Sequence, residues 1–403
     1  MLKTPKSLRL HIGIFGRTNV GKSSFLNMAA GQDVAITSPV PGTTTDVVEK
    51  TMELLPIGPV VFLDTAGLDD ISALGHLRIK KSKRVFGRTD VVILIVEPDR
   101  WSEYEDKVVE EARRRSIPLL IIINKTDISA PSENFISQMK EKTEGVFLVS
   151  SSSIKNRDEY LHAFKRHLIK IVPEDFIKPP PIVGDLIPKG GLAIFIVPID
   201  LEAPKGRIIL PQVQAIRDVL DHDQAVLVVK EHQYKDTLKK LKAPPDIVVC
   251  DSQVVKKMVE DTPKNIKCTT FSILFARFKG GLDEMIKGVK AIDSLTPLDR
   301  VLVAEACSHH AIEDDIGRVK LPKWLKSYVG GELKIDTVAG KDYPEDLEKY
   351  KLIIHCGGCM INTREVLTRI ERAKEKNIPI TNYGLAIAHI HGYLERVTEL
   401  FAK

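Results

Sequence analysis

Residues 16–23 read Gly-Arg-Thr-Asn-Val-Gly-Lys-Ser, and this pattern constrains the fold more than any other part of the chain. An apolar run over 11–15 precedes it, and a helix-like stretch over 24–30 follows it. In this setting a loop between two glycines can turn its backbone N–H groups toward a polyphosphate, while Lys22 reaches the β and γ oxygens and Ser23 binds Mg²⁺. The pattern therefore predicts a phosphate-binding loop between a strand and a helix of an α/β sheet.

Four further polar segments follow in the order that a GTPase needs. Residues 41–46 read Pro-Gly-Thr-Thr-Thr-Asp, where a threonine would complete the coordination of Mg²⁺. Residues 64–67 read Asp-Thr-Ala-Gly, where Asp64 would reach Mg²⁺ through water and the Gly67 amide would meet the γ-phosphate. Residues 124–127 read Asn-Lys-Thr-Asp, and a carboxylate there selects guanine over adenine by accepting from N1 and N2. Residues 150–152 would offer an N–H to guanine O6.

Because ligands of open α/β sheets bind at the carboxyl ends of strands, the joint pattern predicts an enzyme that hydrolyses GTP. The residues expected to act in hydrolysis are Lys22, Asn19, Thr44, Asp64 and Gly67, with Ser23 and Thr44 on Mg²⁺. The residues expected to contact the nucleotide and its metal are Gly16, Thr18, Asn19, Val20, Gly21, Lys22, Ser23, Ser24, Thr43, Thr44, Asp64, Asn124, Lys125, Asp127, Ser150 and Ser151.

Residues 7–170 resemble small GTPases of the Era and TrmE type, through Asn-Val-Gly-Lys-Ser-Ser over 19–24 and Gly-Thr-Thr-Thr-Asp over 42–46. Leu68 stands where Ras-type enzymes carry a water-orienting glutamine, so the resemblance implies slow intrinsic hydrolysis. Asn19 matches the asparagine that helps TrmE-like relatives bind K⁺ beside the phosphates, which implies K⁺-stimulated turnover. The alternative is that Asn19 only shapes the loop.

The chain has 403 residues, enough for about two to four domains. Three consecutive prolines at 179–181 indicate a linker, after which strand-like and helix-like segments alternate. We expect an α/β protein of three domains: a P-loop GTPase sheet over 1–172 and two smaller Rossmann-like α/β domains over 182–265 and 266–403. The middle domain shows no catalytic grouping, and its apolar run 192–197 would make an adhesive edge strand if uncovered. Homodimerisation through this sheet is therefore a hypothesis.

The net charge of +5 is only mildly basic, so nucleic acid is not an expected partner. The sequence has no apolar run near the length of a membrane span and no apolar signal segment at its start, so we expect no membrane association and a cytoplasmic location.

Cysteine and histidine follow two apolar runs in the last third of the chain. Residues 307–310 read Cys-Ser-His-His after the run 300–306, and residues 355–359 read His-Cys-Gly-Gly-Cys after the run 350–354. If the two runs are parallel neighbours in one sheet, both groups face one cleft and would hold a soft metal. Three interpretations stay open: a structural zinc, a redox pair, or an iron–sulfur cluster with three cysteines and one open iron. The odd number of cysteines favours the cluster.

The whole chain resembles the HydF family of GTPases that mature [FeFe]-hydrogenase, through Cys-x-His over 307–309 and His-Cys-x-x-Cys over 355–359. The resemblance implies a [4Fe–4S] cluster on Cys307, Cys356 and Cys359, with a site for a di-iron precursor. It also implies delivery of that precursor to apo-[FeFe]-hydrogenase beside companion radical S-adenosylmethionine maturases, with GTP as a switch. The fourth position of the cluster stays open between His309, His355, His310, Glu305 and solvent. The alternative function is an RNA- or ribosome-associated GTPase with a structural zinc.

Overall fold

The computed structural model describes residues 4–30, 48–55, 57–64, 84–153, 156–199, 208–306, 315–340 and 342–402. The chain divides into two compact units, Met1–Pro179 and Pro180–Lys403. The division falls inside the run of three prolines. Each unit is described by itself below.

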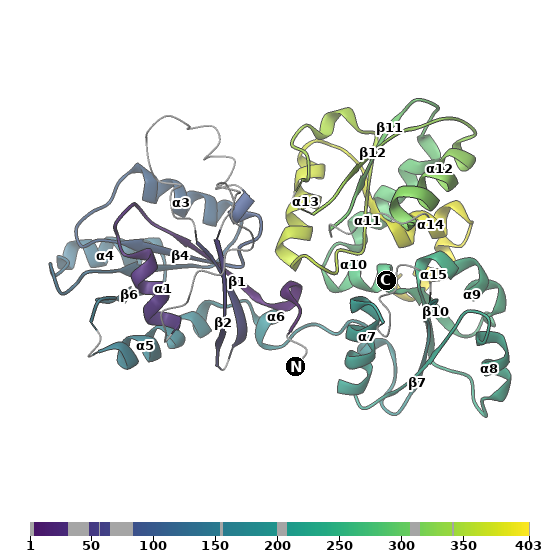
Figure 1. Cartoon of the computed structure of the whole chain (residues 1–403), viewed down its shortest axis with the longest axis horizontal. Coiled ribbons are helices and arrows are strands. Elements are labelled where there is room, and N and C mark those ends of the chain that lie inside the picture. The colour runs from purple at the N-terminus through teal and green to yellow at the C-terminus, as the bar shows by residue number, and fades with distance from the viewer. Residues whose placement is uncertain are drawn as a thin grey trace. The chain divides into compact units, whose positions relative to one another are not determined.

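The N-terminal unit is built on a six-stranded sheet with the order β2-β3-β1-β4-β5-β6. Strand β2 is antiparallel to β3, and the other pairs are parallel. The central strands are continuous apolar runs because both faces of a parallel sheet are covered. Its strands are β1 (Leu10–Phe15), β2 (Val48–Leu54), β3 (Gly58–Asp64), β4 (Val91–Val96), β5 (Leu119–Ile123) and β6 (Gly145–Leu148) (Figure 1).

Helices cover this sheet and form a hydrophobic core on each face. On one face Phe25 packs edge-on against Phe164, and on the other Phe15 stacks on Phe86 with ring centroids 4.3 Å apart. The described helices of this unit are α1 (Lys22–Ala30), α3 (Glu103–Arg114), α4 (Glu133–Lys142), α5 (Arg157–Ile171) and α6 (Glu174–Ile177).

The C-terminal unit contains two four-stranded sheets in which every pair is parallel. The first has the order β10-β9-β7-β8 and the second β12-β11-β13-β14. The first sheet consists of β7 (Leu192–Ile196), β8 (Ala225–Val229), β9 (Ile247–Cys250) and β10 (Lys267–Thr270). The second consists of β11 (Arg300–Ala304), β12 (Lys334–Val338), β13 (Leu352–His355) and β14 (Ile380–Asn382). The predicted α/β class, a P-loop sheet followed by smaller α/β sheets, is confirmed.

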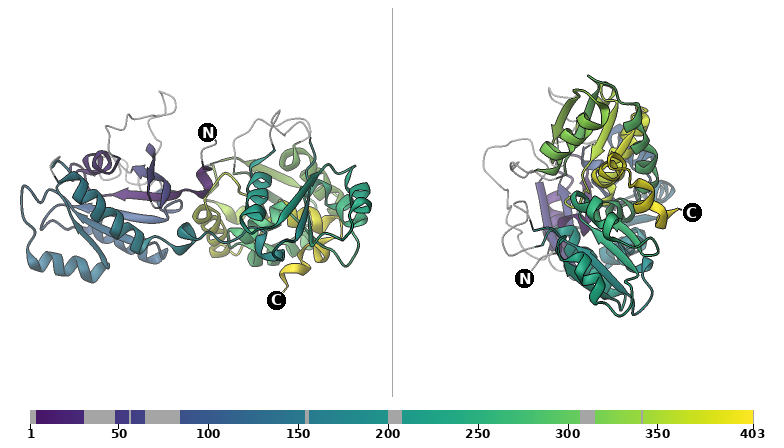
Figure 2. Two further views of the ribbon diagram at one scale, coloured as in Figure 1. Left: turned by 90° about the horizontal axis from the view of Figure 1, so that it is seen from below. Right: turned by 90° about the vertical axis from the view of Figure 1, so that its right-hand side faces the viewer.

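The helices of this unit pack around the two sheets, and α12 and α13 lie on opposite sides of strands β11 and β12 in Figure 1. The chain ends in a short turn of helix over Glu399–Phe401, beside the marked C-terminus in Figure 2. The helices are α7 (Leu210–Asp221), α8 (Tyr234–Lys240), α9 (Val255–Asp261), α10 (Phe271–Phe278), α11 (Leu282–Val289), α12 (Leu321–Val329), α13 (Thr363–Glu375), α14 (Tyr383–Ile390) and α15 (Leu394–Thr398). Within the described ranges, no helix is long and apolar enough to cross a bilayer.

The apolar run 192–197 forms an interior strand of the sheet and not an exposed edge strand. Strand β7 pairs with β8 on one side and with β9 on the other, and its side chains from Ala193 to Ile196 are buried. The outer strands of this sheet are β8 and β10. A self-association through this sheet would therefore involve its outer strands or its helices.

Strand β10 pairs with β9, so the residues directly after the expected boundary at 265 add a strand to the first sheet of the unit. The change of sheet comes between β10 and β11, across the two helices α10 and α11. This arrangement places α10 next to β14 of the second sheet.

Candidate functional site

The phosphate-binding loop lies where the sequence predicts it, between the end of β1 and the start of α1. Asn19, Gly16 and Gly21 have positive φ angles of 66°, 147° and 97°, which glycine and asparagine adopt more readily than other residues. A Cβ atom at Gly21 would stand 2.2 Å from Nδ2 of Asn124. The loop therefore needs glycine at this position for both its backbone conformation and its packing.

Replacing Gly21 with alanine is expected to destabilise the N-terminal unit by about 1–3 kcal/mol, because the new methyl group meets Asn124 in a strained backbone conformation. Urea unfolding followed by fluorescence would measure the loss. Gly58→Ala is a matched control, since Gly58 has a φ of 96° and the nearest atom to its Cβ position is 4.0 Å away. Equal losses for the two variants would show that the contact with Asn124 has no effect.

Lys22 opens α1 and turns back over the loop. Its ammonium donates hydrogen bonds to the carbonyl oxygens of Gly16 and Arg17, the second at 2.8 Å, and the side chain is buried. Ser23 and Ser24 follow it in the first turn of the helix, so the loop amides, the helix N-terminus and a cation converge. This arrangement is suited to binding a polyphosphate.

Asn124 connects the phosphate loop to the loop expected to read the base. Its side-chain amide donates to the carbonyl of Val20 at 2.8 Å, and its Oδ1 accepts from the backbone N–H and the hydroxyl of Ser151 at 3.0 and 2.8 Å. Asp127 lies on the surface, and a hydrogen bond from Ser150 lowers the pKa of its carboxyl. The carboxylate is therefore ionised and able to accept hydrogen bonds from a base.

Two contacts to the phosphate loop come from α3 and were not expected from the sequence. The hydroxyl of Tyr104 accepts from the N–H of Gly16 at 3.2 Å, and Arg17 pairs with the buried carboxylate of Glu105 at 2.8 Å. Glu105 also completes the capping box of α3 with Ser102. A capping box is visible in a sequence, but the contact of Glu105 with Arg17, 88 residues before it, is not.

Other expected residues of the nucleotide site are only partly described. Asp64 ends β3 and is buried, at the same carboxyl edge of the sheet as the phosphate loop. The predicted residues Thr43, Thr44, Gly67 and Leu68 lie outside the part of the chain that the structure describes.

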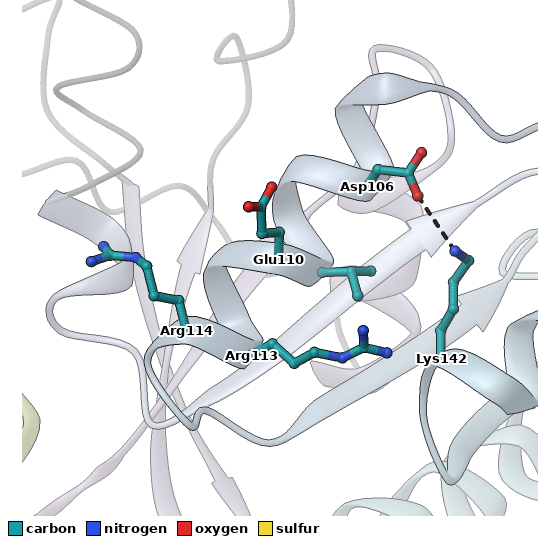
Figure 3. Close-up of a pocket in the computed structure, with 6 residues that line it drawn as sticks. Asp106, Glu110, Arg113, Arg114 and Lys142 are labelled. Atoms are coloured by element: carbon teal, nitrogen blue, oxygen red, sulfur yellow. Dashed lines mark hydrogen bonds and ion pairs between the residues drawn. The ribbon is translucent and has the colours of Figure 1, made fainter.

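A shallow pocket on α3 is separate from the nucleotide site. It lies along the outer side of α3 and the end of α4, and none of its residues is an expected nucleotide contact (Figure 3). Asp106 and Lys142 form an ion pair across it at 3.4 Å. Its lining residues are Asp106, Val109, Glu110, Arg113, Arg114 and Lys142.

In the C-terminal unit, the two strands that precede the cysteine motifs are parallel neighbours, which is the condition for both motifs to face one site. Ala304 of β11 stands opposite His355 of β13, and the N–H of Cys356 donates to the carbonyl of Ala304 at 2.9 Å. Both chain segments therefore leave the sheet at the same edge.

The thiol of Cys356 sits in a cradle of backbone amides. Its Sγ accepts from the N–H of Ala306 at 3.1 Å and from the N–H of Gly358 at 3.4 Å. Burial raises the pKa of Cys356, and these two N–H groups act against that rise. Burial also raises the pKa of Cys359 to about 11, while the nearby charge of Lys279 acts to lower it. Burial therefore outweighs the amide cradle and the cation, which act toward the thiolate form that binds a metal.

His355 uses both ring nitrogens inside the protein. Arg369 is always protonated and donates to Nε2 at 3.0 Å, so Nδ1 carries the proton and donates to the carbonyl of Cys356 at 2.6 Å. Burial and the charge of Arg369 lower the pKa of His355 to about 3, so the ring is neutral at physiological pH. In this arrangement the hydrogen bond from His355 holds the backbone carbonyl of Cys356 in place.

Glu305 is likewise engaged. It is buried one residue before Ala306, and its carboxylate forms a two-pronged ion pair with Arg318, the closest contact being 2.8 Å. Asp315 caps the turn that carries Arg318. These contacts fix the described chain on both sides of the segment that contains Cys307.

The donor chemistry of this edge fits an iron–sulfur group. Cys356 and Cys359 share one turn, backbone amides point at sulfur, and Ala306 directly precedes Cys307. Cys307, His309 and His310 lie outside the described residues, and among those described no group of three or more potential metal ligands occurs.

Two further cysteines and two further histidines have partners or packing elsewhere in the C-terminal unit. Cys250 and Cys268 are buried in the hydrophobic core. His389 pairs with Asp293 at 2.7 Å, and His391 contacts the ring of Trp324.

Comparison with protein families gives three matches along the chain. Residues 11–125 match a family described as 50S ribosome-binding GTPase. Residues 182–280 match the hydrogen maturase F dimerization domain, and residues 283–400 match the hydrogen maturase F tetramerization domain.

Individual relatives match part of the chain. A tRNA modification GTPase MnmE from a Synechococcus strain is 42% identical over 125 residues, which is 30% of this chain and 26% of that protein. A GTPase Era from a Thermoanaerobacter strain is 28% identical over 226 residues, covering 53% of this chain and 72% of Era. The chain therefore spans about a quarter of the length of the MnmE relatives.

Among solved structures, Aquifex aeolicus Era bound to GDP and aluminium fluoride aligns over 55% of this chain and 93% of its own, with 20% identity and a TM-score of 0.33. The family assignment depends instead on the matches to family models. Those for the two hydrogen maturase F domains together span more than half of the residues and follow a GTPase domain, so this chain belongs to the HydF family of hydrogenase maturases.

Proposed function

We propose that this chain hydrolyses GTP and serves as a scaffold for iron–sulfur chemistry in the maturation of [FeFe]-hydrogenase. In this proposal Cys307, Cys356 and Cys359 hold a [4Fe–4S] cluster, and the surroundings of its open iron accept a di-iron precursor. The chain then delivers the precursor to apo-[FeFe]-hydrogenase, with radical S-adenosylmethionine maturases as further partners.

The observation that carries the proposal is the parallel pairing of β11 with β13. The pairing brings Ala306, the residue before Cys307, to Cys356. The N–H of Ala306 contacts the sulfur of Cys356, although Cys356 lies 49 positions after Cys307 in the sequence. The cluster would supply an exchangeable iron position, and the protein would supply thiolates, amide donors and a cleft at one edge of the sheet.

At the nucleotide site, Lys22 and the loop amides would bind the β- and γ-phosphates, and Ser23 with Thr44 would hold Mg²⁺. Asp127 would select guanine. Hydrolysis would be slow because Leu68 cannot orient water, and K⁺ held near Asn19 would supply positive charge in the transition state. Asn19 is exposed in the loop, where it would be accessible to such a cation; the alternative is that its left-handed backbone only shapes the loop.

Oligomerisation is supported by the matches to dimerization and tetramerization domains. We propose a homodimer as the basic unit, with the partly exposed outer strand β8 available in the first sheet of the C-terminal unit. We also propose that the protein is located in the cytoplasm.

Anaerobic iron and acid-labile sulfide analysis of the purified, reconstituted chain, with its absorption spectrum, tests the proposal. We expect about four iron and four sulfide per chain with charge-transfer absorption in the visible range. Stoichiometric zinc without iron after reconstitution would reject the scaffold and favour the alternative, an RNA-associated GTPase with a structural zinc.

A further inference from the structure

Lys279 joins the two sheets of the C-terminal unit at the cysteine turn. It follows α10 directly, in the segment matched by the dimerization domain, and only 1% of its surface is exposed. Its ammonium donates to the carbonyl oxygens of Gly358, at 2.7 Å, and of Ile361. Both acceptors belong to the turn that carries Cys356 and Cys359.

These contacts constrain the path of the turn. Gly358 lies in the left-handed region with a φ of 65°, and its carbonyl is held by a cation that cannot reach solvent. Burying an ammonium group is costly unless it is hydrogen-bonded, so a conformation of the turn that withdrew these carbonyls would remove two of the hydrogen bonds of Lys279. The buried cation therefore favours one conformation of the cysteine turn.

The charge itself acts on the same site. Arg369, the other buried cation beside the turn, is paired with Glu365 at 2.9 Å and bonds to His355 and to the carbonyl of Gly340. Lys279 donates to the carbonyl oxygen of Gly358, the residue directly before Cys359, so its charge lies beside the cysteine turn. A cluster bound by thiolates is anionic, and one-electron reduction adds a further negative charge. A fixed positive charge nearby therefore favours the reduced cluster.

We propose that Lys279 is a positioning residue that holds the cysteine turn ready for the cluster and raises the reduction potential of that cluster through its positive charge. This inference rests on the proposed function, because it concerns the cluster expected at Cys356 and Cys359.

Three variants of the full chain separate geometry from charge. Lys279→Arg keeps the charge and the donors, Lys279→Gln keeps donors without the charge, and Lys279→Met removes both with a side chain of similar length. Lys287→Met is the matched control, because it removes the same charge from a side chain that is 74% exposed on α11. Each protein is reconstituted anaerobically with ferrous iron and sulfide, its iron content is measured, and its potential is titrated by electron paramagnetic resonance.

We expect Lys279→Gln and Lys279→Met to shift the ratio of reduced to oxidised cluster at least tenfold toward the oxidised form, which is about 59 mV for a one-electron couple. Lys279→Met should also bind less iron, whereas Lys279→Arg and the Lys287→Met control should stay near the unsubstituted protein. If Lys279→Met fails to fold, Lys279→Gln still tests the charge.

Potentials and iron contents unchanged in Lys279→Gln and Lys279→Met would overturn the inference while leaving the scaffold function intact. Failure of the unsubstituted chain to take up iron would instead reject the proposed function itself. The two failures are therefore distinguishable within one experiment.

Discussion

Replacing Cys356 with alanine is expected to abolish assembly of the cluster and to leave GTP hydrolysis nearly intact. The sulfur of Cys356 is the point where the segment leaving β11 and the turn after β13 meet, since it accepts the amides of Ala306 and Gly358. Removing it takes away one proposed ligand and the contact that joins both segments. Bound iron should fall to background, and the rate of hydrolysis should change by less than about twofold.

Cys268→Ala is the appropriate control for this variant. Cys268 is also a free cysteine, but it is buried in β10 within the hydrophobic core, so its replacement should preserve iron binding. A Cys356→Ala protein that retained a full complement of iron would contradict the proposed ligand set. A protein that lost hydrolysis as well would mean that the two sites depend on each other structurally.

Replacing Lys22 with alanine should have the opposite effect. The ammonium of Lys22 lies over the phosphate loop, where it contacts the carbonyls of Gly16 and Arg17, and a GTPase uses such a cation to stabilise charge that develops on the phosphates. Losing one charged donor of this kind typically lowers the rate by at least about a hundredfold. Phosphate release under saturating GTP would measure the loss, and iron content should not change.

Lys140→Ala removes an equivalent charge from the exposed side of α4 and should leave hydrolysis unchanged. A Lys22→Ala protein that hydrolysed GTP within threefold of the unsubstituted rate would remove Lys22 from the catalytic set. Together with Cys356→Ala, this variant tests whether nucleotide turnover and cluster assembly are separable activities of one chain.

The sequence predicted best the features that are encoded by neighbouring residues. The phosphate loop needs two glycines and a lysine within eight positions, and the apolar runs before it and before Asn124 are continuous because those strands are buried on both faces. The pairing of β11 with β13 could be anticipated as well, because both cysteine motifs directly follow apolar runs.

The surroundings of the cysteine turn could not be anticipated in the same way. Lys279 stands 79 residues before Gly358, and Arg369 and Arg318 reach their partners across helices and loops. A single lysine or arginine in a helical stretch is normally a solvated residue, and only tertiary packing turns it into a buried donor. The interior position of β7 was missed for a related reason, since strand order depends on pairing partners that no local pattern specifies.

The contact between Lys279 and the cysteine turn also determines where this protein can be divided. A shortened chain that began at residue 283 would keep the whole second sheet of the C-terminal unit but would lack the cation beneath its cysteines. One that began at residue 266 would keep Lys279 but would separate β10 from its partner β9. Neither cut yields an intact half, so the region of the cysteine turn has to be expressed and engineered together with the sheet before it.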